Sequence, residues 1–254
     1  MFLILFDQKL HIAPITSSPI RVIDLGCGTD IWCMDFADEH PSSDVLGVDL
    51  SPIQPSFTPP NCIFEIDDVT SSWTWPLNYF DFVNIRSLYG SIASWRALYA
   101  EIFNHMTPGG YLHQLEMSVQ FESDDGTLAS DHVLSQWSDV FHDASKKFRE
   151  SFYEVWNLSR YIRNQGFVDA VERIYKVPVN GWPADPHLKE LGRWDYLHIT
   201  QGAEGWGLML LTKVMGWSVQ EAQVFIAKFR NGVRERKEHA YLEVVVIHAR
   251  KPGA

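Results

Sequence analysis

The sequence predicts an α/β fold with a doubly wound parallel sheet, and three observations support this prediction. Short apolar runs alternate with segments of helical spacing through the first half of the chain. Each apolar run stops at a polar or charged residue, as buried parallel strands do at the edge of a sheet. The first run leads through a glycine-rich turn directly into a helix, which is typical of a βαβ series.

The individual elements follow from these patterns. Strands are expected at residues 21–25, 45–49, 63–66, 82–85, 110–117 and 241–247. Helices are expected at residues 31–39 and 92–105, within 127–152, and in a run that ends near Gly216. Ser218 and Glu221 form a capping box, which predicts that one more helix begins there.

The length and composition of the chain suit one domain. With 254 residues and 46% hydrophobic content, the chain can bury a core of ordinary size. We therefore expect a single domain over residues 1–254, with a helical insertion at about residues 120–165.

The charge balance indicates which partners the surface disfavours. The chain carries 21 Lys and Arg against 32 Asp and Glu, a net charge of -11. Such an acidic surface repels phosphate backbones and anionic lipid headgroups, so neither nucleic acid nor a membrane surface is expected as a partner. The apolar opening at residues 1–6 is too short for a signal peptide or a membrane span.

Cysteine and histidine usage points to a reducing compartment without a metal site. Cys27, Cys33 and Cys62 are an odd number, at spacings that fit neither a disulfide framework nor a zinc knuckle. The ten histidines include no pair at a recognised metal-ligand spacing, so no metal is expected. A cytoplasmic or nuclear protein is the prediction.

The strongest local signal is the turn Asp24-Leu-Gly-Cys-Gly-Thr29, where the first strand leads into the first helix. Gly26 permits a tight turn, and Gly28 lets the backbone approach a ligand without a Cβ in the way. A nucleotide-type cofactor fits such a turn. The dinucleotide fingerprint needs a further glycine where Ile31 stands, so nicotinamide or flavin binding, and hence a nicotinamide-dependent reductase, is disfavoured.

Acidic residues end the second and third strands. Asp49 ends the second, where a carboxylate can accept hydrogen bonds from two ribose hydroxyls; a structural or solvated aspartate is the alternative. Asp67 and Asp68 end the third, where a carboxylate or backbone group could meet an adenine amine. The pair could equally cap the following turn through local hydrogen bonds.

These residues occur in runs that resemble the fungal LaeA-like methyltransferases. The matching runs are residues 21–29, 36–41, 47–55, 59–68 and 108–111, and later Leu191-Gly192, 216–218, 239–241 and 250–252. The resemblance spans nearly the full chain. It implies a seven-stranded class I methyltransferase (Rossmann-like) sheet with inserted helices over the ligand edge, S-adenosylmethionine (SAM) as cofactor, and a role in secondary metabolism.

The resemblance also implies a set of cofactor-binding residues. Carried over position by position, this set is Asp24, Gly26, Cys27, Gly28, Asp30, Asp49, Leu50, Asp67, Asp68 and Arg86. Asp24 and the two glycines fall at the methionine end of SAM, Asp49 at the ribose, and Asp67 or Asp68 at the adenine. Arg86 and Gly90 match the motif after the fourth strand, beside the methyl-donor end.

The chain departs from the family at four points. Asp30 replaces the third motif glycine, which puts a Cβ and a negative charge near the expected place of the methionine carboxylate. Asp30 could instead turn outward or pair with the methionine ammonium. Asn84 stands where the family usually has His, and His113 where it usually has Glu. Met1 aligns within the family's domain, so the helices that usually precede it are expected to be missing.

Two classes of function follow. The first is methyl transfer from SAM to an oxygen, nitrogen or sulfur atom of a small molecule. His113, His142 and His239 are candidate bases, although each could be a structural or surface histidine. Trp137 and His142 are candidate substrate-pocket residues, because the inserted helix normally covers the substrate site. The second class is a methyltransferase fold without methyl transfer, either a regulatory subunit with a protein partner or a repurposed pathway enzyme such as a cyclase.

Overall fold

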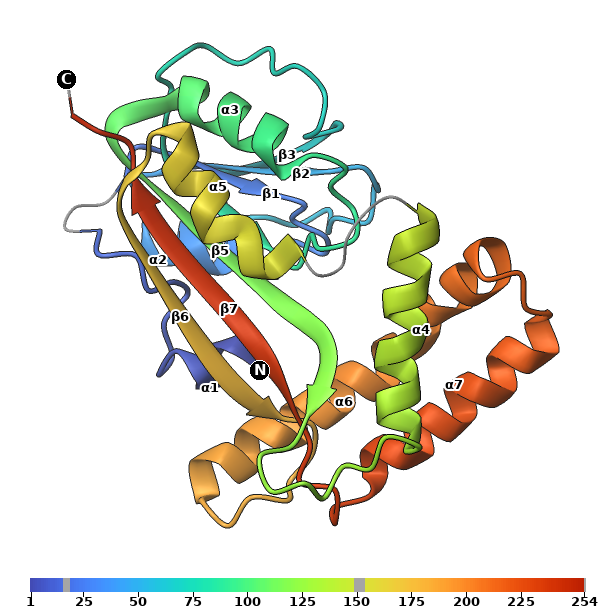
Figure 1. Cartoon of the computed structure of the whole chain (residues 1–254). Helices are drawn as coiled ribbons and strands as arrows, with labels where there is room; N and C mark the ends of the chain where they lie inside the picture. Colours follow the sequence, from blue (N-terminus) through green and yellow to red (C-terminus); the bar gives the residue numbers. More distant parts are fainter. Residues whose placement is uncertain (16–18, 149–153, 254) are drawn as a thin grey trace. The chain divides into compact units, whose positions relative to one another are not determined.

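The computed structural model describes residues 1–15, 19–148 and 154–253. Its strands are β1 (Arg21–Leu25), β2 (Asp44–Asp49), β3 (Cys62–Ile66), β4 (Phe80–Arg86), β5 (Met106–Glu122), β6 (Val168–Pro178) and β7 (Tyr241–Arg250) (Figure 1). Its α-helices are α1 (Phe2–Leu5), α2 (Ile31–Glu39), α3 (Trp95–His105), α4 (Val133–Phe148), α5 (Leu158–Gln165), α6 (Pro186–Met209) and α7 (Val219–Arg234). A 3-10 turn, η1 (Glu154–Asn157), precedes α5, and a π-helical turn, η2 (Leu210–Val214), continues α6.

The strands form one seven-stranded sheet in the order β3-β2-β1-β4-β5-β7-β6. Pairing is parallel from β3 through β5, and the chain order reverses between β1 and β4. Ligands of open α/β sheets bind beyond the carboxyl ends of the strands at such a reversal. Figure 1 shows β7 running opposite to its neighbours, so the sheet is mixed. The predicted doubly wound α/β fold is confirmed. The expectation that all strands of the sheet run parallel is wrong for β7.

Strand β6 has no counterpart among the strands expected from apolar runs. Most of its residues are exposed or half-buried, and it lies at the edge of the sheet. Hydropathy patterns detect a strand through its buried positions, and an edge strand with few of them gives a weak signal. Only the family resemblance implied this seventh strand.

The residues group into two compact units. The sheet unit comprises Gln8–Glu116, Glu154–Arg173 and Val245–Ala254, and the helical unit comprises Met1–Asp7, Met117–Tyr153 and Ile174–Val244. The expectation of one domain over residues 1–254 therefore stays a prediction.

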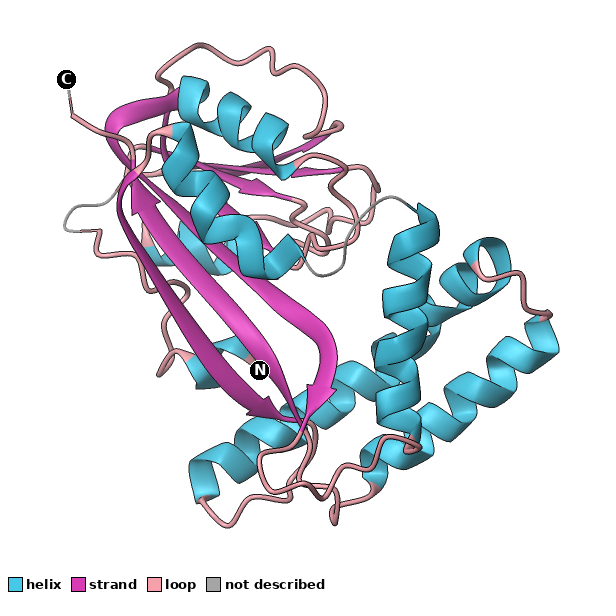
Figure 2. Ribbon diagram, in the orientation of Figure 1, coloured by secondary structure: helices cyan, strands magenta, loops and turns pink. Residues whose placement is uncertain are grey.

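The sheet unit has a hydrophobic core on each face. One cluster packs Leu98, Tyr99 and Ile102 of α3 and Ile162 of α5 against the strands. Figure 2 shows these two helices on the same side of the strands. The other cluster packs α2, through Phe36 and its neighbours, against Val22, Phe82 and the adjoining segment. Because side chains alternate along a strand, Asp24 shares the α2 face with Val22.

The helical unit contains the helix that the sequence placed within residues 127–152. This helix, α4, begins at Val133, because the preceding residues form a polar turn in which Asp125 accepts hydrogen bonds from Thr127 and Ser123. Phe152, part of its expected apolar face, lies outside the described residues. The predicted capping box at Ser218 is confirmed at the start of α7.

Trp137 of α4 belongs to the core of the helical unit. It is 3% exposed and stacks on Phe229 of α7, with 3.8 Å between the ring centroids. It also stacks on Phe225 and lies against Gly207 of α6. The expectation that Trp137 lines a substrate pocket is therefore wrong, because the ring is enclosed by neighbouring helices.

Candidate functional site

The turn between β1 and α2 folds back on strand β2. The backbone N–H groups of Gly26 and Cys27 both donate to the carbonyl oxygen of Val48, at 2.8 and 3.1 Å. Gly26 has a φ of +70°, and a Cβ there would lie 2.3 Å from the side chain of Leu88. Gly28 has a φ of +61°, yet apart from its own atoms and its two chain neighbours no described atom lies within 4 Å of the position that its Cβ would take. Gly28 thus borders open space, as a backbone that receives a ligand must.

Asp49 lies beside this turn at the end of β2. One carboxylate oxygen accepts the N–H of Gly28 at 2.9 Å, and the other accepts the N–H of Ser51 at 2.8 Å. The side chain is half-buried, and Leu50 next to it is exposed. A carboxylate has about four lone-pair sites, so these two bonds leave capacity for further donors. The structure therefore brings Asp49 and Gly28 together, as the sequence predicted.

Asp24 is buried behind the turn. Its carboxylate accepts a 2.7 Å hydrogen bond from the amide of Asn84 and a 3.5 Å bond from the thiol of Cys33. Burial raises the pKa of Asp24 to about 6, while the nearby charge of Arg86 opposes the rise. Asp24 and Arg86 are thus electrostatic neighbours. Cys33 was not predicted as a site residue. Its thiol reaches Asp24 because Cys33 lies in the first turn of α2.

Asp30 is fully buried and precedes α2 in the left-handed region, with a φ of +66°. Among the described residues, neither of its carboxylate oxygens has a hydrogen-bond partner. The side chain points at β2, where the Cβ position of Gly47 is 3.0 Å from one of its oxygens. Burial raises the pKa of Asp30, the neighbouring thiol of Cys27 opposes this rise as a weak donor, and the charge of Asp49 adds to it. No atom of Asp30 lies within 4 Å of the position that a Cβ of Gly28 would take, and the predicted contact of Asp30 with the cofactor stays a prediction.

Asp67 and Asp68 follow β3 and make local hydrogen bonds. Asp68 accepts both the N–H and the hydroxyl of Thr70, at 2.9 and 2.7 Å, and these bonds lower the pKa of its carboxyl group. Asp67 accepts the N–H of Asp68 at 2.7 Å. The local cap that the sequence left open as an alternative is the arrangement observed for Asp68. Contact of either residue with adenine stays a prediction.

Asn84 and His113 continue the buried polar row that starts at Asp24. The register aligns Asp24 with Asn84 and Asn84 with His113 across β1, β4 and β5. The His113 ring pairs with the Asn84 side-chain oxygen at 2.9 Å, and burial lowers the pKa of His113 well below its usual range. His113 is therefore poorly suited to accept a proton, and its role as a base stays a prediction.

The other two histidine candidates belong to the helical unit. His142 is exposed on α4. His239 pairs with the Asp125 carboxylate at 2.6 Å and stacks on Trp182 at 4.7 Å between ring centroids. These contacts give His239 a structural explanation, and a catalytic role for either histidine stays a prediction.

Glu116 supports the site in a way that the sequence analysis missed. Its buried carboxylate accepts the backbone N–H groups of Leu88 and Tyr89, at 3.3 and 3.0 Å, and the amide of Gln114 at 3.2 Å. These bonds hold the segment after β4, where Leu88 packs on Gly26. Burial raises the pKa of Glu116 to about 7. A charged residue inside the otherwise buried run of β5 was the signal that could have revealed it.

This fold and glycine turn define a class of protein, and comparison with known families agrees. Residues 1–171 match the family model described as a methyltransferase domain. The chain belongs to this family, the SAM-dependent methyltransferases of class I fold, and the predicted fold, enzyme class and cofactor are confirmed at that level.

Two fungal relatives specify the resemblance further. The chain is 37% identical to the secondary metabolism regulator LAE1 of Cochliobolus heterostrophus, over 96% of this chain and 81% of the relative. It is 32% identical to the methyltransferase pytC of Aspergillus terreus, over 98% of this chain and 76% of that protein. The predicted resemblance to LaeA-like methyltransferases is confirmed.

A solved structure supports the fold. The SAM complex of phosphoethanolamine N-methyltransferase 2 from Haemonchus contortus superimposes with a TM-score of 0.57 at 17% identity, covering 94% of this chain and 50% of that chain. At this identity the likeness concerns the fold alone.

Proposed function

We propose that this chain transfers the methyl group of SAM to an oxygen, nitrogen or sulfur atom of a small-molecule secondary metabolite. The observation that carries the proposal is the pairing of Gly28, which borders open space, with Asp49, which is fixed at the same turn by two backbone N–H groups. The family and its fungal relatives support the same conclusion.

The residues of the turn fit the cofactor. Bound SAM supplies an electrophilic methyl group. Asp49 would accept hydrogen bonds from the ribose hydroxyls with its remaining lone pairs, and its bond to Gly28 fixes the turn relative to that contact. Gly26 and Gly28 keep side chains away from the methionine end. Asp24 and Arg86 would set the local charge there, because the charge of Arg86 acts on the Asp24 carboxyl group.

Positioning is the main catalytic contribution that we assign to the chain. A methyl transfer proceeds fastest when donor and acceptor are held in line, and orientation of this kind can supply several kcal/mol of a barrier. A base is needed only if the acceptor must lose a proton. Because burial lowers the pKa of His113, we do not assign that task to it.

The experiment combines binding and turnover on the full chain. Calorimetric titration should detect binding of SAM and of its demethylated product, S-adenosylhomocysteine. Incubation with methyl-labelled SAM and organic extracts of fungal cultures should then transfer label to a small molecule. No binding at millimolar ligand would exclude the enzyme proposal.

A regulatory role is the second candidate, favoured by the 37% identity to a protein named as a secondary metabolism regulator. In this case the chain would bind SAM without transferring label to small molecules, and a protein partner would take the substrate's place. Binding without transfer in the same experiment would favour this candidate. A cytoplasmic or nuclear location fits both candidates, and we propose no nucleic-acid partner because of the net charge of -11. Among the described helices, none is long and apolar enough to cross a bilayer.

A further inference from the structure

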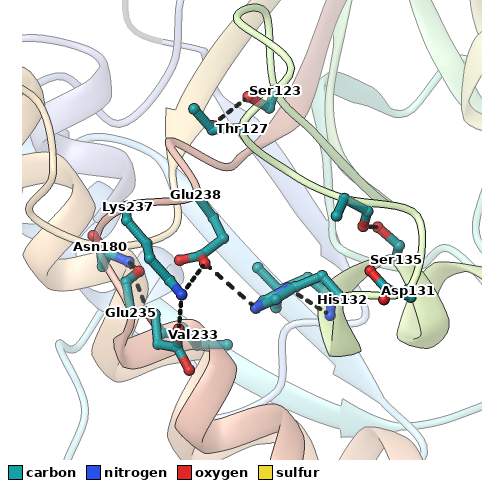
Figure 3. Close-up of polar contacts among 12 residues, drawn as sticks. Ser123, Thr127, Asp131, His132, Ser135, Asn180, Val233, Glu235, Lys237 and Glu238 are labelled. Atoms are coloured by element: carbon teal, nitrogen blue, oxygen red, sulfur yellow. Dashed lines mark hydrogen bonds and ion pairs between the residues drawn. The ribbon is translucent and has the colours of Figure 1, made fainter.

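Three potential metal ligands meet within the helical unit, and none of them belongs to the set of residues assigned to the cofactor turn. His132 immediately precedes α4, Glu235 follows the last residue of α7, and Glu238 lies in the segment that leads to β7. Their ligand atoms all lie within 4.8 Å of one another. Figure 3 shows the Glu238 carboxylate between the His132 ring and the Lys237 ammonium.

Glu238 is an incompletely satisfied buried acid. The residue is 5% exposed, and among the described residues one of its carboxylate oxygens has no hydrogen-bond partner. The other oxygen lies 3.9 Å from the His132 ring nitrogen Nε2 and 3.5 Å from Lys237 Nζ. A buried carboxyl group that keeps its charge is paired or coordinates a metal. The Lys237 side chain is 79% exposed, so its ion pair is largely screened by solvent.

The space around these ligands is large enough for an ion and its water. An open surface depression of about 780 Å³ has His132, Glu235, Lys237 and Glu238 in its lining, together with Asp131 and Lys228. Lys237 Nζ also lies 3.3 Å from Glu235, so this ammonium sits between the two carboxylates. A positive charge therefore occupies the place that the two acids favour for a cation.

We propose that His132, Glu235 and Glu238 bind a zinc-class divalent metal ion, with Lys237 as the cation that the metal displaces. Imidazole nitrogen and carboxylate oxygen are both ligands that Zn²⁺ takes in proteins, and three such ligands with water as the fourth are the pattern of open zinc sites. Tetrahedral Zn²⁺ needs ligand atoms about 3.3 Å apart, given bonds of about 2.0–2.2 Å. The three ligand atoms must therefore move closer together than the 4.8 Å that now bounds their separations. Rotation of the exposed Glu235 side chain permits this movement.

Metal binding has a local consequence at the start of α4. The Nδ1 atom of His132 accepts the N–H of Leu134 at 3.3 Å, which leaves the ring proton on Nε2, facing Glu238. A metal on Nε2 moves this proton to Nδ1 and ends the bond from Leu134. The ion would then replace a weak helix cap by a bond that ties the start of α4 to the end of α7.

The sequence analysis expected no metal, because these ligands have no recognisable spacing. His132 is far from Glu235 and Glu238 along the chain, and only the antiparallel approach of α4 and α7 brings them together. The proposed metal site is independent of the methyl-transfer proposal, since it contains none of the cofactor residues.

The test is calorimetric titration of the chelator-treated full chain with Zn²⁺ under reducing conditions, together with thermal unfolding. We expect one Zn²⁺ to bind at this site and to raise the unfolding temperature. Glu238→Gln and His132→Asn should each weaken this binding at least tenfold. Asn at position 132 can still cap α4, so loss of binding in that variant reports the lost ligand rather than a lost cap.

Two further variants keep the result interpretable. Lys237→Met removes the competing ammonium and should tighten Zn²⁺ binding at least threefold. This expectation can be tested whether or not Glu238→Gln folds. His187→Asn, at an exposed histidine of α6, is the matched control and should bind as the wild type does. The three cysteines remain in every variant, so any Zn²⁺ that they take contributes equally. Equal binding by wild type, His132→Asn and Lys237→Met, or no binding by the wild type at millimolar Zn²⁺, would overturn the proposal.

Discussion

The sequence predicted the positions of some side chains near the cofactor turn but not the positions of others. The spacing of Gly26, Gly28 and Asp49 predicted their meeting, because strand ends and their turns lie at one edge of a parallel sheet. The direction of the Asp30 side chain could not be predicted, since it depends on the gap left by Gly47 in the neighbouring strand. The partners of Asp24 likewise depend on register between strands, which apolar patterns do not reveal.

Asp30 supplies a prediction at this scale. Asp30→Gly relieves a left-handed backbone and removes a buried carboxyl group whose only assigned donor is the weak thiol of Cys27, so the free energy of unfolding should rise by about 1 kcal/mol. Because the side chain points at β2, affinity for S-adenosylhomocysteine should change less than twofold. Urea denaturation and calorimetry measure the two quantities.

Asp30→Asn is the matched variant, since it keeps the backbone strain and removes only the carboxylate. It should show a smaller gain in stability than Asp30→Gly. A tenfold tighter affinity in either variant would mean that the charge of Asp30 reaches the ligand, as the sequence first suggested.

At the scale of elements, apolar periodicity identified the buried strands and most helices but not the edge strand β6. Strand β5 runs from Met106 to Glu122, longer than the expected 110–117, and α4 begins six residues after the predicted segment does. The later start of α4 follows from the local polar turn around Asp125, which hydropathy does not reveal. Strand β5 also holds the segment after β4, because Glu116 accepts two of its backbone N–H groups. Hydropathy does not reveal such a tertiary contact.

Glu116 predicts how stability depends on pH. Burial raises its pKa from 4.5 in the unfolded chain to about 7, so folding takes up a proton between these values. The contribution of Glu116 to stability is thus fully present below about pH 4.5 and is lost as the pH rises through 7. The shift corresponds to roughly 3 kcal/mol. Urea denaturation from pH 5 to 8 should show this loss.

Glu116→Gln removes the titrating group and should remove its share of the loss over that range. Asp24, whose pKa burial raises to about 6, acts with the same sign, whereas His113, whose pKa burial lowers, acts with the opposite sign. The quantity that tests Glu116 is therefore the difference in slope between the variant and the wild type. A Glu116→Gln variant with the same slope as the wild type would show that the carboxylate stays ionised throughout, held by its three N–H donors.

At the scale of the whole molecule, the sequence predicted the class of fold and the family because both rest on a chain-long order of strands, helices and motifs. The resemblance supplied the seventh strand that hydropathy lacked. The grouping into a sheet unit and a helical unit was not predicted, since each unit combines segments far apart in the chain. The His132, Glu235 and Glu238 cluster was missed for the same reason.

The central claim is that open space beside Gly28 receives the adenosyl cofactor, and affinity of the Gly28→Ala variant for S-adenosylhomocysteine tests it most directly. Gly126→Ala is the matched control, because Gly126 also has a positive φ, of +73°, and no atom within 4 Å of its Cβ position. Both variants should lose about 1 kcal/mol of stability from left-handed strain. Only Gly28→Ala should bind the ligand at least tenfold more weakly, and wild-type affinity in that variant would contradict the account.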